Sequence, residues 1–166
     1  MKPKILWSVG LVAALAFMGS RPAMAQTPPH TRVDGLIHDF TAALDAGGPW
    51  EISGEFELAL NAATRKVELT ATLSMVRADT TPRSAHTHHL RMVDGEPTGI
   101  GNGVRIVGTA AITTNGSLAT FTGSPVVIEL TGGAALVFSN FKITFGGGAA
   151  GHYGPDPIDG VVSLKR

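Results

Sequence analysis

Three of the six histidines in the chain lie within four positions, at His86, His88 and His89. An imidazole nitrogen can bind a metal ion or exchange a proton near neutral pH, so this spacing is the strongest chemical signal in the sequence. On a β-strand, residues two apart project from the same face about 6.6 Å apart, given a rise of about 3.3 Å per residue. His86 and His88 can then converge on one ion at bond lengths of about 2.0–2.1 Å.

A metal site of this kind needs a third ligand. We expect it from His152, which follows the glycines at 146–148 in a segment predicted to be a loop folding over the end of the domain. The weaker candidates are carboxylates: Asp94, Glu96, Asp156 and Asp159. A ligand set of nitrogen and carboxylate oxygen without thiolate favours zinc or copper(II). We therefore predict a zinc or copper site at His86, His88 and His152.

The alternation of side chains along the strand leaves other roles open for these histidines. It places His86 and His88 on the same face as Leu90 and Met92, toward the core, and His89 on the opposite face. Two inward imidazoles could instead be polar core residues that hydrogen-bond to the backbone. They could also be the polar contact for a small apolar ligand inside a barrel.

An enzymatic role is a further alternative that the sequence does not decide. The histidines could act as acid–base groups if a carboxylate or a hydroxyl lay within hydrogen-bonding reach. The sequence contains no Gly-x-Ser-x-Gly nucleophile motif and no Gly-x-x-x-x-Gly-Lys phosphate loop. A structural protein without a small-molecule site is equally consistent with the composition.

Short runs of Val, Ile, Thr and Phe, separated by Gly, Asn, Asp and Pro, are typical of antiparallel β-structure. The clearest alternation of apolar and polar residues covers 50–61 and 66–75, which we expect to form a long hairpin. The histidine strand follows at 85–93. A further strand over 104–112 is expected to lead into a tight hairpin turn at Asn115-Gly116.

Glycine and proline mark the expected interruptions of these strands. Asp94 to Pro97 predicts a turn that extends into a loop over 99–103, and 123–125 predicts a break between two strands. Residues 33–44 fit one face of a helix or one face of a strand. A strand is preferred there because the segments that follow are β.

About eight or nine strands joined by short turns predict a single all-β antiparallel domain. We expect a small closed barrel, with a closure similar to that of lipocalins or of allene oxide cyclases, rather than an open sandwich. The sequence shows no internal repeat and no long low-complexity linker. The expected domain covers residues 33–166 and follows a flexible lead at 26–32.

The first 25 residues have the pattern of a secretory signal peptide. A basic start and an apolar run over residues 5–18 precede Ala23-Met24-Ala25, which has small residues at the two positions that signal peptidase reads. The apolar run is shorter than the ~20 residues that a helix needs to span a membrane. We therefore expect cleavage before Gln26 and a secreted or periplasmic protein without a membrane span.

Charge and cysteine content narrow the range of partners. Removal of residues 1–25 would leave ten basic and thirteen acidic residues, a balance that argues against nucleic acid as a partner. The absence of cysteine excludes thiol catalysis, thiolate–metal sites and disulfides. The expected partner is a metal ion or a small molecule, and no nucleotide cofactor is expected.

Overall fold

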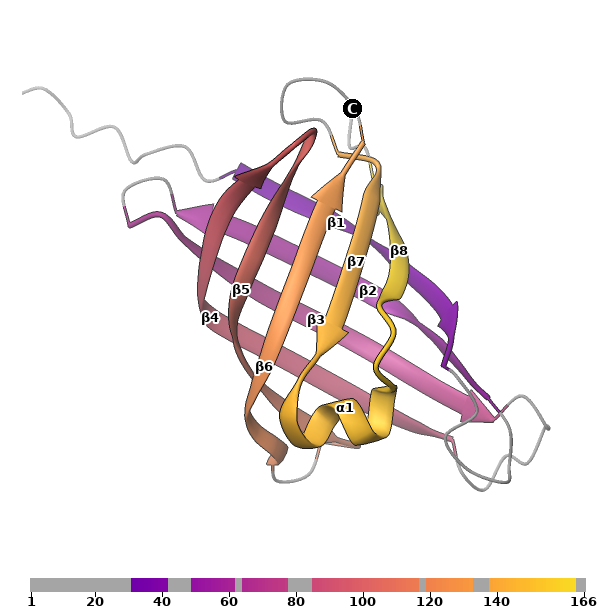
Figure 1. Cartoon of the computed structure of the whole chain (residues 1–166). Helices are drawn as coiled ribbons and strands as arrows, with labels where there is room; N and C mark the ends of the chain where they lie inside the picture. The colour runs from indigo at the N-terminus through magenta and orange to yellow at the C-terminus, as the bar shows by residue number, and fades with distance from the viewer. Residues whose placement is uncertain are drawn as a thin grey trace, which may run out of the picture.

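The computed structural model describes residues 31–41, 49–61, 64–77, 85–116, 119–132 and 138–163, which form eight strands and one short helix (Figure 1). The strands are β1 (Thr31–Phe40), β2 (Trp50–Asn61), β3 (Lys66–Arg77), β4 (His86–Ile100), β5 (Gly103–Thr114), β6 (Ala119–Thr131), β7 (Asn140–Phe145) and β8 (Ile158–Ser163). The helix α1 (Gly147–Tyr153) lies between β7 and β8 in the chain.

The strands form a closed antiparallel barrel. Each strand pairs with the next one in the chain, and β1 pairs with β8 to complete the ring. This closing ladder is short, with four residue pairs from Asp34↔Ser163 to Ile37↔Gly160. In Figure 1, β2 and β3 run diagonally behind the steeper β6 and β7, as expected for the tilted strands of a barrel. The predicted small all-β barrel is confirmed, and the open sandwich is excluded.

Inward-facing apolar side chains fill the barrel. Alternate residues of β3 are buried, and solvent does not reach Leu69, Leu73 or Met75. A period of two is expected where one face of a strand packs into the core and the other faces water. Phe56 of β2 and Phe141 of β7 stack inside the barrel, with their ring centroids 3.8 Å apart. The core therefore joins strands that are not neighbours in the sheet.

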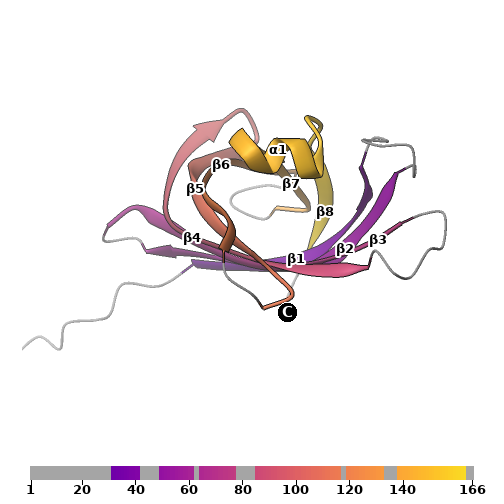
Figure 2. The same ribbon diagram turned by 90° about the horizontal axis from the view of Figure 1, so that it is seen from below.

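The helix α1 replaces the loop that was predicted after Gly146, so that prediction is wrong. Viewed from the end of the barrel that carries the helix, α1 lies on the side of β6 and β7 (Figure 2). Ala149 and Tyr153, four residues apart, are its buried residues, and Tyr153 stacks on Phe145 with ring centroids 4.1 Å apart. Because three of the seven residues are glycine, we attribute the helix to this packing rather than to helix propensity.

The turn predicted at Asp94 to Pro97 is also wrong, and the loop predicted at 99–103 is shorter than expected, because β4 continues to Ile100. The strand accommodates the extra residue as a bulge: Val93 and Asp94 are both exposed, between the buried Met92 and Gly95. Position 95 is crowded, since a Cβ there would lie 2.8 Å from Cγ2 of Ile106 and 3.0 Å from the Val67 carbonyl oxygen, which favours glycine. The chain reverses after the strand, at 101–102.

A second bulge replaces the break predicted at 123–125. Phe121 lies opposite Ile112 and Ser124 lies opposite Ala110, so the pairing of β5 with β6 shifts between these positions without ending. Gly123 takes a φ of +64°, a conformation that glycine adopts at little cost. Glycine and proline therefore mark a bend within one strand at this point.

The N-terminal part of the barrel begins earlier than expected, because β1 starts at Thr31. The preference for a strand over a helix is confirmed for 33–40, while residues 42–48 lie outside the described residues. The expected signal peptide and the cleavage site before Gln26 also lie outside them. Within the described part of the chain, no helix is both long and apolar enough to cross a membrane.

Candidate metal centre

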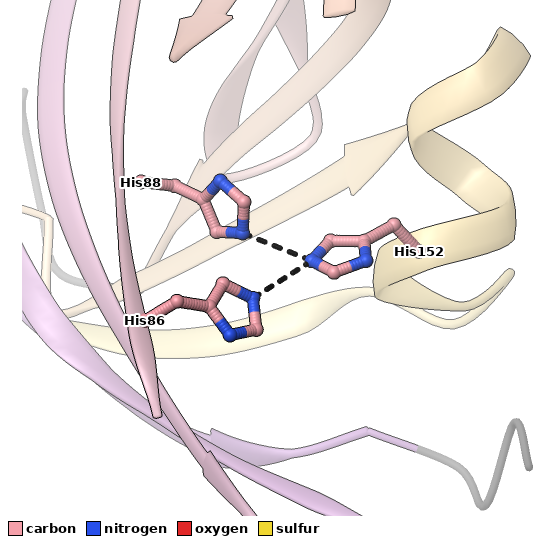
Figure 3. Close-up of side chains that lie close together, drawn as sticks. All are labelled: His86, His88 and His152. Carbon is pink, nitrogen blue, oxygen red and sulfur yellow. Dashed lines mark hydrogen bonds between the residues drawn. The ribbon is translucent and has the colours of Figure 1, made fainter. Parts of the chain in front are cut away.

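Three histidine rings converge at the end of the barrel that carries α1 (Figure 3). His86 and His88 come from the first residues of β4, and His152 comes from α1. The Nε2 atom of His152 lies 3.2 Å from Nε2 of His86 and 2.9 Å from Nε2 of His88. One ligand atom from each of the three residues lies within 4.8 Å of the other two. The structure therefore brings together the three residues that the sequence had singled out.

The position of the two β4 histidines follows from the strand pairing on both sides. His86 and His88 lie opposite Met75 and Leu73 of β3, and the parity prediction is confirmed because His88 is buried while His89 is exposed. The period of two along β4 thus points both site rings inward.

The hairpin turn between β5 and β6 holds the residue between these two histidines. Asn115 and Gly116 have φ values of 49° and 70°, the positive values that the predicted primed turn requires at its two central positions. The backbone N–H of Thr87 donates to Asn115 Oδ1 at 2.9 Å, and the N–H of Asn115 donates to the Thr87 carbonyl at 2.7 Å. These two hydrogen bonds fix the start of β4, from which His86 and His88 project.

The helix positions the third ring through its buried neighbour. Tyr153 is 1% exposed, and its ring contacts both His152 and His88, with centroids 5.0 and 5.4 Å away. His152 therefore cannot move far from β4 without disturbing the stack of Tyr153 on Phe145.

The cluster lies between the core and the surface. His88 is 1% exposed, whereas His86 and His152 are partly exposed. Trp50 packs edge-to-face with His86 at a centroid distance of 5.1 Å, and Phe121 lies 5.8 Å from His152. Both aromatic residues are only partly buried, so apolar ring surface borders the two histidines that are themselves partly exposed.

The surroundings of the rings favour neutral imidazoles. Burial, followed by repulsion from His152 and His86, lowers the pKa of His88 to about 4. Burial and repulsion from His86 also lower the pKa of His152. At neutral pH both rings are therefore unprotonated on one nitrogen, which is the form that binds a metal ion.

Hydrogen bonds on the far side of His88 select its tautomer. Its Nδ1 atom lies 3.1 Å from Oγ1 of Thr114, and the Thr113 backbone also hydrogen-bonds to the ring. Thr114 Oγ1 is in turn 2.6 Å from Oγ1 of Thr120. A proton on Nδ1 would be donated to Oγ1 of Thr114, and we propose this tautomer for His88. The lone pair of Nε2 then points into the cluster.

The remaining predicted candidates lie elsewhere. The carboxylate of Asp94 accepts hydrogen bonds from Thr109, Glu96 pairs with Lys66, and Asp159 lies 3.2 Å from Lys142 Nζ. Asp156 is exposed, and no Asp or Glu of the described residues belongs to the histidine group. The outward His89 contacts Thr72, and His38 contacts Glu51.

Sequence reasoning missed the residues that surround the three rings. Extending the alternation of 104–112 by one step would have placed Thr114 on the inner face. The alternation over 50–61 likewise places Trp50 on the apolar face, but it does not bring that residue to the cluster, and no comparable signal identified Phe121 of β6. Tyr153 was not assigned a role either. Its hydroxyl is buried and has no hydrogen-bond partner among the described residues, and burial raises its pKa.

The pocket that the described residues enclose inside the barrel is small. An apolar pocket of about 90 Å³ is lined by Leu60, Pro97 and Phe138 together with other apolar side chains. Small-molecule sites commonly enclose about 300–1,000 Å³. The described interior therefore gives the apolar-ligand alternative weak support.

No protein-family model, no curated protein and no solved structure matches this chain. What the protein does is therefore inferred from its barrel and from the buried histidine cluster, which could hold a metal ion.

Proposed function

We propose that the protein binds one zinc or copper(II) ion through the Nε2 atoms of His86, His88 and His152. The observation that carries this proposal is the convergence of three imidazole nitrogens, two pairs of which lie 2.9 and 3.2 Å apart. The cluster combines strand and helix residues 64 and 66 positions apart in the chain.

The separations of the nitrogens suit both ions. Two nitrogens bound tetrahedrally to zinc at about 2.05 Å are about 3.3 Å apart. At similar bond lengths, the corners of a square-planar copper(II) site are about 2.8 Å apart when adjacent and about 4.0 Å apart when opposite. The observed 2.9 and 3.2 Å are close to the values for both ions, and the third pair, which lies within 4.8 Å, would have to close by up to about 1.5 Å for tetrahedral zinc and by less for opposite corners of a copper square.

The chemistry of the cluster also supports a cation. The Nε2 atom of His152 lies within hydrogen-bonding distance of both other Nε2 atoms, but a single proton or lone pair on it cannot form a linear hydrogen bond to each of them. One positive ion could instead accept a lone pair from each of the three nitrogens at once. Imidazole ligands without thiolate suit zinc and copper.

The test is metal titration of protein purified without a polyhistidine tag. We expect one zinc or copper ion per chain, and a loss of affinity of at least about 10²-fold in His86→Ala, His88→Ala or His152→Ala. The matched control is His89→Ala, on the same strand but facing solvent, which should bind like the wild type. Unchanged stoichiometry and affinity in His88→Ala and His152→Ala would contradict the proposal.

We also infer that the protein acts outside the cytosol, after removal of residues 1–25. The support is the basic and apolar N-terminal pattern ending in Ala23-Met24-Ala25. Mass spectrometry of the protein from its native host should give a chain starting at Gln26. An intact N-terminus on the accumulated protein would argue against export.

A further inference from the structure

We propose that the metal centre keeps one coordination position open and that this position takes a small anion from solution. The inference rests on the proposed metal site and extends it, because it concerns which further ligand the bound ion takes. It follows from the number of protein ligands, from their charge and from the exposure of the rings.

The ligand count leaves a vacancy. Among the described residues, the close group of potential ligands contains three histidines and no carboxylate. Zinc takes at least four ligands, and sites with three protein ligands hold an exchangeable molecule in the fourth position. A square copper(II) site would likewise have one corner unfilled by His86, His88 and His152.

The charge of the site selects an anion for that vacancy. Three neutral imidazoles leave both positive charges of a divalent ion uncompensated. The described carboxylates closest in the chain to the site residues lie outside the histidine group: Asp94 accepts hydrogen bonds from Thr109, and Asp156 is exposed. Because His88 is buried, the positive charge is poorly screened by water and attracts a negative ligand strongly.

Access to the vacancy is from one side. His88 forms the buried side, while His86 and His152 are partly exposed. Trp50 and Phe121 contact these two rings. Apolar ring surfaces therefore lie beside the two partly exposed histidines, and they favour a small, weakly hydrated anion over a strongly hydrated one such as sulfate.

The experiment uses the wild-type protein loaded with one equivalent of copper(II) and freed of excess metal. Azide is added while the visible absorption and the electron paramagnetic resonance spectrum are recorded, with sulfate at equal ionic strength as the control. We expect a saturable new charge-transfer band and a shift in the copper spectrum, with one azide per copper. Sulfate should leave both spectra unchanged.

The outcomes separate this inference from the proposed function. A copper spectrum that azide does not alter, in protein whose copper binding depends on His88 and His152, overturns the open position and leaves the metal site intact. Removal of copper by azide also counts against it. Failure to bind any metal refutes the proposed function itself.

Discussion

His88 is the residue on which the site depends most. It is the most buried of the three rings, it contacts His152 directly, and Thr114 lies against its other nitrogen. Its position within the core means that a proton on this ring is unfavourable in the folded protein. Stability and metal binding should therefore both respond to the charge on His88.

The metal-free protein should lose stability in mild acid because of this ring. The pKa of His88 is about 4 in the folded state against 6.5 as its ordinary value. Between these values the unfolded chain binds a proton that the folded chain does not, so stability falls as pH falls from 6.5 to 4. The upper limit of the loss is about 3 kcal/mol, and His152 adds to it in the same direction.

Urea unfolding of the metal-free protein at several pH values measures this effect. The decline between pH 6.5 and 4 should be shallower in His88→Asn and unchanged in His89→Asn. An equal decline in wild type and His88→Asn would show that His88 does not carry it.

At the scale of elements, the predictable and unpredictable parts of the structure differ in physical origin. The inward direction of His86 and His88 follows from the strict alternation of a strand, so it could be predicted from Leu90 and Met92 alone. The approach of His152 could only be proposed as one option among several, because it depends on contacts between distant segments.

The helix α1 shows why the position of His152 could not be predicted from the sequence. The sequence Gly-Gly-Ala-Ala-Gly-His-Tyr has weak helix propensity, and α1 is held by Ala149 and Tyr153 against the barrel. The sequence did not predict the bulges at Gly95 and Gly123, for a related reason. Glycine has the same local signal in a turn and in a strand that bends, and only the pairing with neighbouring strands distinguishes the two.

The packing of α1 makes a prediction about Tyr153. Its ring is needed for the stack on Phe145, but its buried hydroxyl has no partner among the described residues. Tyr153→Phe should therefore raise the free energy of unfolding by about 1 kcal/mol, because an unsatisfied polar group is removed. Tyr153→Ala should lower it by about 3–5 kcal/mol. Chemical denaturation measures both, and a marked loss in Tyr153→Phe would show that the hydroxyl is satisfied.

At the scale of the whole molecule, a bound ion would connect parts of the barrel that the backbone joins only through a long path. His86 and His152 are 66 positions apart, and the chain has no cysteine to form a disulfide between its segments. A ligand that binds the folded state alone stabilises it according to its concentration relative to its dissociation constant.

Metal should accordingly raise the melting temperature. At a free concentration 100 times the dissociation constant, the stabilisation is about 2.7 kcal/mol, which corresponds to roughly 10 °C for a domain of this size. Differential scanning calorimetry with and without zinc or copper measures the shift. A chelator should reverse it, and His152→Ala should show little of it. An equal shift in His152→Ala would place the ion elsewhere.

The four-pair ladder between β1 and β8 has a consequence for how the polypeptide is made. The strand β1 is synthesised first and β8, which pairs with its second edge, is synthesised last. That edge of β1 therefore stays unpaired through nearly the whole of synthesis. Unpaired strand edges can form hydrogen bonds with strands of other molecules. Any stalled or prematurely terminated product lacking β8 would leave both β1 and β7 in that state, and would therefore be a seed for aggregation rather than a smaller version of the same protein.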